Sequence, residues 1–417
     1  MVGCPWLIVA DDLTGAADCA IAFAKVGLET FVIWNEVGES NGPVMALNTD
    51  SRSLSPDNAA CRQVTGLAAR HRPGMLVYKK IDSTLRGQPA AELAAVCDFL
   101  ATVRGGRAPM ALVAPAFPGT GRSTENGSVR IAGCALEETP LWARDHTYRS
   151  AHLPDILAHV GMSSEILPLA VIRNGIDATA AALTDALARG VAAVVCDAVE
   201  ESDLATIAAA SLPVADELIW VGSGGLAIHL ARLVGNADTP APAVTAPSLG
   251  RPVLVIVGSV AEASRRQAAY LAEQGLAHPL DIGAADLFAG PCSHRWREIR
   301  DDAALHLDAG QDVVMLIAAG AHPDLSRGGE LAALFAELVV PILPAAGGLV
   351  MTGGDTASAV LTRLGVHALR LVAEVEPGVP LGITVGQVAL PVASKAGAFG
   401  DEATLARCVA RLRYNPV

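Results

Sequence analysis

The densest group of chemically useful side chains lies in the segment VYKKIDSTLRG (77–87). Two lysines, an aspartate, two hydroxyl residues and an arginine follow an apolar run that is typical of a buried strand. Lysine and arginine neutralise carboxylates or phosphates, and Ser, Thr and Asp side chains recognise hydroxyl groups. A helix start with Pro89 in its first turn does not explain two lysines at the end of a buried strand. We therefore expect this segment to bind a ligand.

Two other loops also follow predicted strands. In VADDLTGAAD (9–18) two adjacent aspartates end the first strand, and successive strand side chains point to opposite faces. We therefore expect Asp11 and Asp12 not to form a catalytic pair and one of them to face a cleft. Asp12 or Thr14 could instead cap the next helix. In NTDSRS (48–53), Arg52 is either an anion-binding fork or an ordinary surface arginine.

The loop PAFPGTGRSTENG (115–127) is rich in Pro and Gly. Its Asn-Gly pair, Asn126 and Gly127, is a hairpin signal. A plain surface turn and a ligand loop are equally compatible with this composition.

The stretch GGLVMTGGDTASAVL (347–361) passes from a buried strand to a helix through two glycines. Gly353 and Gly354 allow close approach of a ligand to the backbone, and the helix that begins near Asp355 offers free N–H groups and a positive dipole end. This combination favours phosphate, with Asp355 reaching a metal-bound water and Thr356 offering a hydroxyl. The alternative is a helix that Asp355 caps, with no ligand.

Two more junctions in the second half resemble it. In VLVIVGSVAEASRRQ (253–267), Ser259 and Glu262 fit a capping box, but a strand–Gly–Ser–helix junction also suits an anion. In SKAGAFGDEATL (394–405) the glycines and the lysine could close over a nucleotide or form a plain turn. There is neither a GxxxxGK[ST] motif nor a GxGxxG after the first strand, so phosphate binding would depend on these looser junctions.

The positions of these loops follow from the predicted elements. Apolar β-branched runs alternate with amphipathic helices such as 55–70, 90–100 and 180–188, which indicates mainly parallel sheets covered on both faces. The predicted strands are 6–11, 30–34, 43–48, 75–81, 110–115, 191–197, 217–223, 253–258, 313–319 and 349–354. We predict an α/β protein of two domains, each with a mainly parallel sheet flanked by helices and with a cleft between them.

The segment TPAPAVTAPSLGRP (239–252) has the composition of a linker. The predicted domains are therefore residues 1–238 and 253–417, with 239–252 between them. A chain of 417 residues is long enough for two cores.

Composition excludes several classes of function. A formal charge of −13 is unlike the basic surface of a nucleic-acid binder, although a site for a small anion needs only local positive charge. The eight cysteines and ten histidines are dispersed, which argues against a zinc site and for reduced thiols. The N-terminus lacks the basic region of a signal peptide, and we found no apolar run of about 18 residues. We expect a cytoplasmic protein that binds neither nucleic acid nor membrane; a homodimer is compatible with the sequence.

Taken together, the segments resemble the four-carbon acid sugar kinases, a family formerly catalogued as a domain of unknown function. The matching pieces, in the family's order, are ADDLTGAAD, KKIDSTLRG, PAFPGTGRSTENG, GSVAEASRRQ, TGGDTASAVL, EPGVPLG and SKAGAFGDEATL. Two departures are Ala398, where similar proteins often have Asn, and GSGGLA in place of GSAGLA.

The resemblance implies an acid-sugar-binding domain followed by an ATP-binding domain that uses Mg²⁺. It implies a substrate site of Asp12, Arg52, Lys80, Asp82, Ser83 and Arg86, with Asp12 or Asp82 as the catalytic carboxylate. It implies a nucleotide site of Ser259, Gly353, Gly354, Asp355, Thr356, Gly397 and Gly400, and leaves the metal ligands unassigned.

The implied reaction is phosphorylation of the terminal hydroxyl of a tetronate. The KKIDSTLRG form favours D-threonate, with D-erythronate or a 3-oxo-tetronate as alternatives. A non-catalytic two-lobed acid-sugar-binding protein and a dinucleotide-dependent oxidoreductase are competing hypotheses, and the absent GxGxxG weakens the second.

Overall fold

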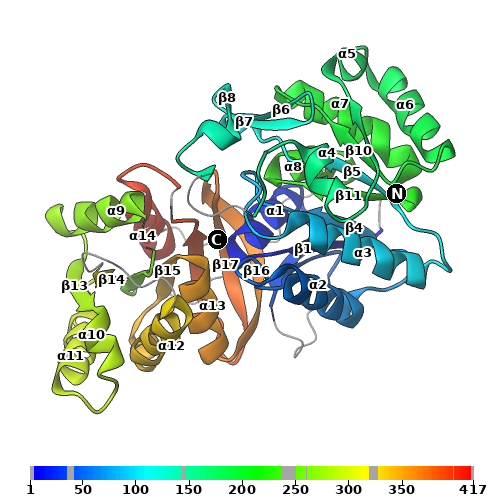
Figure 1. The fold of residues 1–417 in the computed structure, drawn as a ribbon. Coiled ribbons are helices and arrows are strands. Elements are labelled where there is room, and N and C mark those ends of the chain that lie inside the picture. Colours follow the sequence, from blue (N-terminus) through cyan, green and yellow to red (C-terminus); the bar gives the residue numbers. More distant parts are fainter. Residues whose placement is uncertain are drawn as a thin grey trace. The chain divides into compact units, whose positions relative to one another are not determined.

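The computed structural model describes residues 4–34, 42–142, 147–235, 250–259, 261–318, 327–397 and 399–414. The chain divides into two compact units, Met1–Val32 with Asn41–Pro240 and Ile33–Ser40 with Ala241–Val417. Each unit is an α/β structure (Figure 1). The predicted linker 239–252 lies almost wholly outside the described residues, so its exact bounds stay a prediction.

The sheet of the first unit has the strand order β2-β3-β1-β4-β11-β5-β10-β9. Its strands are β1 (Trp6–Ala10), β2 (Thr30–Ile33), β3 (Val44–Asn48), β4 (Leu76–Lys80), β5 (Met110–Ala114), β9 (Ser164–Leu167), β10 (Ala193–Cys196) and β11 (Leu218–Gly222). In this sheet β1 pairs in parallel with β3 and β4, and β11 pairs in parallel with β4 and β5. A small antiparallel sheet contains β6 (Arg122–Glu125), β7 (Ser128–Ile131) and β8 (Cys134–Ala135).

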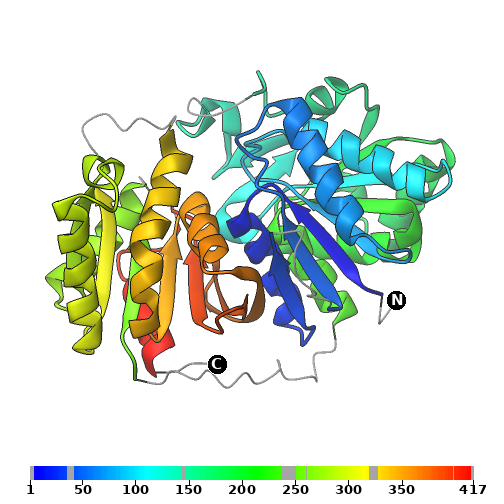
Figure 2. The same ribbon diagram turned by 90° about the horizontal axis from the view of Figure 1, so that it is seen from below.

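Helices cover both faces of the first unit's sheet (Figure 2). The helices are α1 (Leu13–Ala24), α2 (Pro56–Arg70), α3 (Pro89–Val103), α4 (Leu153–Ala158), α5 (Leu169–Ile172), α6 (Ile176–Ala188), α7 (Glu201–Ser211) and α8 (Gly224–Val234). Helices α1, α8, α7 and α6 pack in succession, while α2 packs on α3. Strands buried on both faces explain the continuous apolar runs in the sequence.

The second unit has the strand order β13-β14-β12-β15-β18-β17-β16. These strands are β12 (Val253–Val257), β13 (His278–Gly283), β14 (Val313–Ala318), β15 (Gly348–Thr352), β16 (Val366–Glu376), β17 (Val379–Gly386) and β18 (Pro391–Lys395). Pairings from β13 to β18 are parallel, but β17 is antiparallel to both β16 and β18.

The helices of the second unit are α9 (Glu262–Glu273), α10 (Ala284–Phe288), α11 (His294–Asp308), α12 (Gly328–Val339), α13 (Gly354–Arg363) and α14 (Thr404–Tyr414). Helix α9 packs on α14, and α12 packs on α10 and α13. The buried cluster beneath α9 and α14 contains valines of β12 together with Leu405, Cys408 and Leu412 of α14.

The ten predicted strands and the three predicted helices are all present, with ends shifted by a few residues. The prediction missed β9 and β13, whose partly exposed residues lack a continuous apolar run, and it missed β18, whose apolar stretch is only three residues long. It also missed the hairpin of β16 and β17. Charged residues interrupt the apolar pattern of β16, and Pro380 and Gly382 interrupt that of β17. Mainly parallel sheets are confirmed, and the antiparallel exceptions are this hairpin with β18 in the second unit and the small sheet of β6, β7 and β8 in the first.

One helical stretch, Gly328–Ala345, is apolar and long enough to cross a membrane by length and composition alone. It joins α12 to a 3₁₀ turn, Val340–Ala345, that contains Pro341 and Pro344. The α-helical part has 12 residues, which span about 18 Å at 1.5 Å per residue and so fall short of a hydrocarbon core of about 30 Å. Buried Phe335 and Leu338 on α12 explain the apolar composition by packing within the unit.

Gly225, in the first turn of α8, permits a close approach to a neighbouring loop. A β-carbon there would lie 2.4 Å from the carbonyl oxygen of Ala116. We expect Gly225→Ala to lower the free energy of unfolding by roughly 1–3 kcal/mol, because backbone must move to admit the methyl group.

The matched control is Gly329→Ala in α12, where a β-carbon meets nothing within 4 Å. This variant should be neutral or up to about 1 kcal/mol more stable, because alanine favours the helix. Urea unfolding of both variants provides the measurement, and equal effects would contradict the packing argument.

Candidate functional site

Three neighbouring strands of the first unit end in polar residues. Strand β1 lies between β3 and β4, and all three run in the same direction. Their carboxyl ends therefore meet at one edge of the sheet, which is where ligands bind in open parallel sheets. This edge brings Asp11 and Asp12 together with Arg52 and with the loop that follows Lys80.

Arg52 lies between the two aspartates that follow β1. Its Nε and NH2 donate to the carboxylate of Asp11 at 2.7 and 2.9 Å, and its NH1 and NH2 donate to Asp12 at 2.7 and 2.8 Å. The expectation that these aspartates point to opposite faces is wrong, because β1 ends at Ala10 and the strand alternation stops there. The predicted helix cap is confirmed, because Asp12 Oδ1 accepts from the Gly15 N–H at 2.9 Å.

Asp82 forms the second charged group at this edge. Arg86 donates to its two carboxylate oxygens at 2.9 Å each, and Arg52 NH2 lies 3.9 Å from Oδ1. Thr84 also donates to Asp82 through its hydroxyl and its backbone N–H. Burial would raise the pKa of Asp82, but Arg86 and Arg52 outweigh burial and hold this pKa well below its usual range. Asp82 is therefore a permanent anion, and half-buried Ser83 follows it in the loop.

The two adjacent lysines of β4 have different environments. Lys79 forms an ion pair with Glu92 of α3, at 2.8 Å between Nζ and Oε2. Lys80 is 4% exposed, and its Nζ donates to the Ile81 carbonyl at 2.9 Å. Among the described residues, Lys80 forms no ion pair. The sequence analysis singled out both lysines. In the structure Lys79 belongs to an internal ion pair, whereas Lys80 is a cation that faces the charged cluster near Gly15.

A buried polar network fixes the loop that carries Arg52. Glu92 Oε1 accepts from the Ser51 hydroxyl at 2.6 Å. Gln63 of α2 donates to the hydroxyl oxygens of Thr49 and Ser51 at 2.7 and 3.0 Å. The ion pair of Lys79 with Glu92 is thus linked through Ser51 to the loop of Arg52. Sequence reasoning missed Glu92, since a single glutamate on a helix carries no recognisable signal.

Arg122 is a further cation near Asp82 that the sequence analysis did not single out. Its pKa is lowered by burial, while the neighbouring charge of Asp82 acts in the opposite direction. The predicted hairpin turn is confirmed, because Asn126 and Gly127 connect β6 to β7 with φ of 49° and 73°. The loop 115–127 therefore contains the first strand and the turn of a hairpin, and it also places an arginine close to Asp82.

In the second unit, glycines at three strand ends meet. A β-carbon on Gly258 would lie 1.9 Å from Thr356 Oγ1, and one on Gly397 would lie 1.9 Å from Ser259 Oγ. One on Gly353, whose φ is 101°, would lie 3.3 Å from the Ser259 backbone nitrogen. We call Gly258, Ser259, Gly353, Thr356 and Gly397 the glycine junction. The glycines at 258 and 397 thus leave room for the side chains of Thr356 and Ser259, and Gly353 packs against the backbone of Ser259.

Two capping explanations at this junction are wrong. Helix α9 begins at Glu262 with Ala261 as its N-cap, so Ser259 and Glu262 do not form a capping box; Ser259 Oγ accepts from the Ala261 N–H at 3.2 Å. Helix α13 has Gly353 as its N-cap and no side-chain cap, while Asp355 is exposed in its first turn. The first N–H groups of α13 are therefore not capped by a side chain, as an anion site requires.

Gly400 lies apart from these contacts. Its φ is 84°, and a β-carbon there would lie 2.1 Å from Thr404 Oγ1. Gly400 thus shapes the start of α14, and its predicted contact with a nucleotide stays a prediction. The departure at Ala398 lies outside the described residues.

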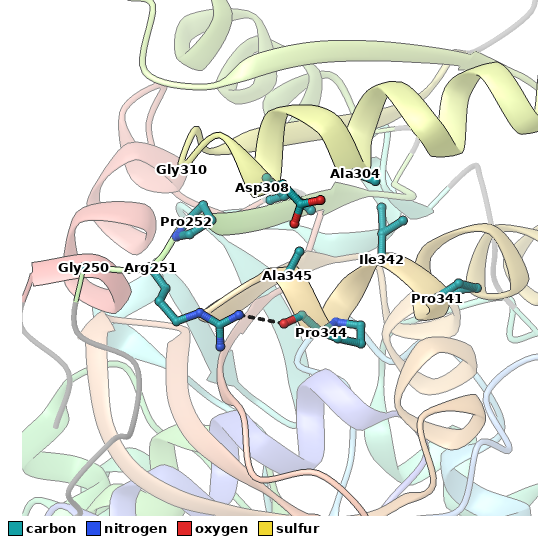
Figure 3. Close-up of a pocket in the computed structure, with 11 residues that line it drawn as sticks. Gly250, Arg251, Pro252, Ala304, Asp308, Gly310, Pro341, Ile342, Pro344 and Ala345 are labelled. Atoms are coloured by element: carbon teal, nitrogen blue, oxygen red, sulfur yellow. Dashed lines mark hydrogen bonds between the residues drawn. The ribbon is translucent and has the colours of Figure 1, made fainter.

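A hollow of about 630 Å³ lies in the second unit, at the end of its sheet opposite the glycine junction (Figure 3). Pro252 precedes β12, Gly310 precedes β14 and Ala345 precedes β15, so the hollow is at the amino ends of the strands. Arg251, which lines it, donates to the Pro344 carbonyl at 2.6 Å. Ligands of parallel sheets bind at the carboxyl ends, so we place the candidate nucleotide site at the glycine junction.

His278, Asp302 and His306 have ligand atoms within 4.8 Å of one another, a grouping that sequence spacing did not reveal. The two imidazole rings stack at 3.5 Å between centroids with 16° between their planes. Parallel rings do not direct two nitrogen lone pairs at one point, so this arrangement is unsuited to tetrahedral coordination.

Comparison with known proteins adds independent information. Residues 6–230 match the model of a sugar-binding N-terminal domain, and residues 254–405 match that of a nucleotide-binding C-terminal domain. The chain is 42% identical over 96% of its length to a D-threonate kinase of Cupriavidus necator, of which 96% is covered. It is 34% identical over 94% of its length to a 3-oxo-tetronate kinase of Methylobacterium radiotolerans, of which 95% is covered.

Among solved structures, a protein described as a putative tRNA synthase from Salmonella typhimurium LT2 has a similar fold. Its TM-score is 0.80 at 21% identity, with 97% of this chain and 98% of that chain covered. At this identity the likeness concerns the fold alone.

The ion pair of Lys79 with Glu92 generates a stability prediction. Lys79→Met should lower the free energy of unfolding by about 3–5 kcal/mol, because it leaves a buried carboxylate without its cation. The double variant Lys79→Met with Glu92→Leu should recover most of this loss, because no buried charge remains.

Urea unfolding followed by circular dichroism measures these changes. The control is Glu217→Gln, which breaks the exposed ion pair with Arg107 and should cost no more than about 1 kcal/mol. A double variant that loses at least as much stability as Lys79→Met would contradict the account.

Proposed function

Because the chain belongs to the family that joins a sugar-binding N-terminal domain to a nucleotide-binding C-terminal domain, we propose that it is an ATP-dependent sugar-acid kinase. The proposed reaction moves the γ-phosphoryl group of ATP to the terminal hydroxyl of a four-carbon sugar acid. D-threonate is the preferred substrate, because the relative with 42% identity over nearly the whole chain is a D-threonate kinase. That extended similarity is the observation that carries the proposal.

The substrate carboxylate would be held by Lys80 and Arg86. Among the described residues, Lys80 has no ion-pair partner, and Arg86 uses only its Nε and NH2 in bonds to Asp82. Arg52 has a different proposed role, because four of its hydrogen bonds go to Asp11 and Asp12. It would keep the aspartates in place and bind substrate through its remaining hydrogen on NH1.

Asp12 is the preferred carboxylate for orienting the attacking hydroxyl and accepting its proton. Its side chain is 21% exposed, compared with 3% for Asp11 and 10% for Asp82, so it is the most accessible of the three. Asp82, whose pKa is held well below its usual range, is poorly suited to accept a proton. Asp82 would instead recognise substrate hydroxyls together with Ser83.

The glycine junction would bind the phosphates of ATP. Its glycines leave no room for a side chain beside the hydroxyls of Ser259 and Thr356, and the first turn of α13 lacks a side-chain cap. Exposed Asp355 in that turn would reach Mg²⁺ through a water molecule, a mode that suits this ion. When bound, Mg²⁺ neutralises the charge that develops on the phosphates during transfer.

Two alternatives remain within the kinase class, and one lies outside it. D-erythronate and 3-oxo-tetronates differ from D-threonate only at the second and third carbons. A sugar-acid-binding protein without catalysis would use the first unit alone.

The first test is ADP release from MgATP in the presence of D-threonate, D-erythronate and a 3-oxo-tetronate. We expect release that depends on substrate, with the highest kcat/KM for D-threonate. Saturable binding of D-threonate without any ADP release would overturn the kinase proposal and favour the binding protein.

The second test concerns the catalytic carboxylate. Asp12→Asn should lower kcat by about 10²–10⁴-fold, because asparagine still caps α1 but does not accept a proton. The control is Asp98→Asn on the exposed side of α3, which should leave kcat unchanged. A full kcat for Asp12→Asn, with loss of turnover in Asp82→Asn, would reverse the assignment.

The third test separates the two edges of the nucleotide-binding unit. Asp355→Asn should weaken MgATP binding or lower turnover by about tenfold, because it removes charge beside the proposed metal. Asp308→Asn, in the hollow at the amino ends of the strands, should change neither. The reverse pattern in titration calorimetry would move the nucleotide site to the hollow.

A further inference from the structure

Lys395 is a buried cation beside the glycine junction. It is the last residue of β18 and pairs with Thr352, the last residue of β15, just before the glycines that open α13. The lysine is 1% exposed, so its ammonium group is removed from water. Such burial is rare for a lysine that lacks a counter-charge.

The hydrogen-bond partners of this ammonium group are neutral. Lys395 Nζ donates to Ser264 Oγ at 3.1 Å and to the Gly397 carbonyl at 3.4 Å. The Ser264 hydroxyl in turn contacts Thr352 Oγ1 at 2.8 Å and the Gly397 carbonyl at 2.7 Å. Among the described residues, no carboxylate forms an ion pair with Lys395, so its charge is solvated by the Ser264 hydroxyl and the Gly397 carbonyl.

The surrounding elements supply little compensating charge. Burial lowers the pKa of Lys395 to about 8, and Cys408 of α14 and Glu376 of β16 offset only part of this effect. Glu376 is itself bonded to Thr404 and Arg407 of α14. In this network helix α9 supplies the hydroxyl of Ser264 and strand β15 supplies that of Thr352, and β17 carries no titratable residue.

The missing counter-charge fits the proposed ligand of the junction. Gly397, whose carbonyl accepts from Lys395, lies against Ser259, and Ser259 lies against Gly353. An anion bound at the glycine junction would be separated from the ammonium group of Lys395 by one layer of backbone, in a region of low polarity. Electrostatic attraction across such a region is stronger than in water.

We propose that Lys395 is a positioning residue that holds a positive charge beneath the glycine junction for the nucleotide phosphates, and that nucleotide binding is coupled to proton uptake by Lys395. This inference rests on the proposed function, because it takes the junction as the nucleotide site. The proton comes from the buffer and binds to Nζ, and no other bond changes.

The direction of the coupling follows from linkage. An anion nearby favours the charged form of a lysine and therefore raises its pKa. Near pH 8 about half of the free protein has neutral Lys395, so binding takes up as much as about half a proton per nucleotide. Near pH 6 the lysine is already charged and uptake by this residue vanishes. Affinity therefore declines as the pH rises through and above 8.

The experiment is titration calorimetry with MgADP at pH 8 in buffers of different ionisation enthalpy, whose slope counts the protons taken up. Wild-type protein should take up as much as about half a proton. Lys395→Met should take up none and bind at least about tenfold more weakly, because the charge is gone. Lys395→Arg should retain binding without uptake, because arginine stays charged.

Lys25→Met, at an exposed position after α1, is the matched control and should behave as the wild type. Thermal unfolding checks that each variant is folded. If Lys395→Met does not fold, the inference is tested by comparing the proton uptake of the wild type with that of Lys395→Arg. Wild-type binding with no proton uptake, or equal uptake in Lys395→Arg, overturns the inference. A wild type that binds no nucleotide would instead refute the proposed function.

Discussion

The site of the first unit depends on the balance of charge where parallel strands end together. Asp11, Asp12 and Asp82 meet at one sheet edge and would repel one another, but Arg52 contacts all three. Arg86 completes the neutralisation of Asp82. An arginine suits this position because its planar group donates to two carboxylates at once. The guanidinium of Arg52 therefore helps to lower the pKa values of Asp11 and Asp82, and it holds Asp11 and Asp12 in place at a position where a sugar acid could be recognised.

The proposed anion site of the second unit is built mainly from glycine backbone, in contrast to the charged side chains of the first unit. Gly258, Gly353 and Gly397 have no side chains, so backbone groups, the hydroxyls of Ser259 and Thr356 and the start of α13 come together there. Polar groups stand behind this junction, since the hydroxyls of Ser264 and Thr352 and the ammonium of Lys395 are buried together. The two units thus share one principle, in which a ligand meets groups that the protein has already held in position.

Much of the fold was predictable because long apolar runs record burial on both sides of a sheet. The β16–β17 hairpin was not, since charged residues such as Arg370 and Glu374 interrupt its pattern. Local junctions were also misjudged, because Ser259 fits a helix cap by spacing but α9 begins only at Glu262. The spacing of Ser259 and Glu262 shows only that they are close in the chain. The residue at which a helix begins also depends on how the helix packs in the fold.

The sequence by itself determined the two-domain α/β class and the loops in which functional residues lie, because strand period, glycine position and motif order are local properties. It also determined the family. Only the tertiary structure decided which charged residues pair with one another. Lys79 forms an ion pair with Glu92, whereas Lys80 faces the candidate site. Asp11 and Asp12 both pair with the same arginine. Such pairings join residues that are distant along the chain, and only packing of the strands and helices brings their charges within bonding distance.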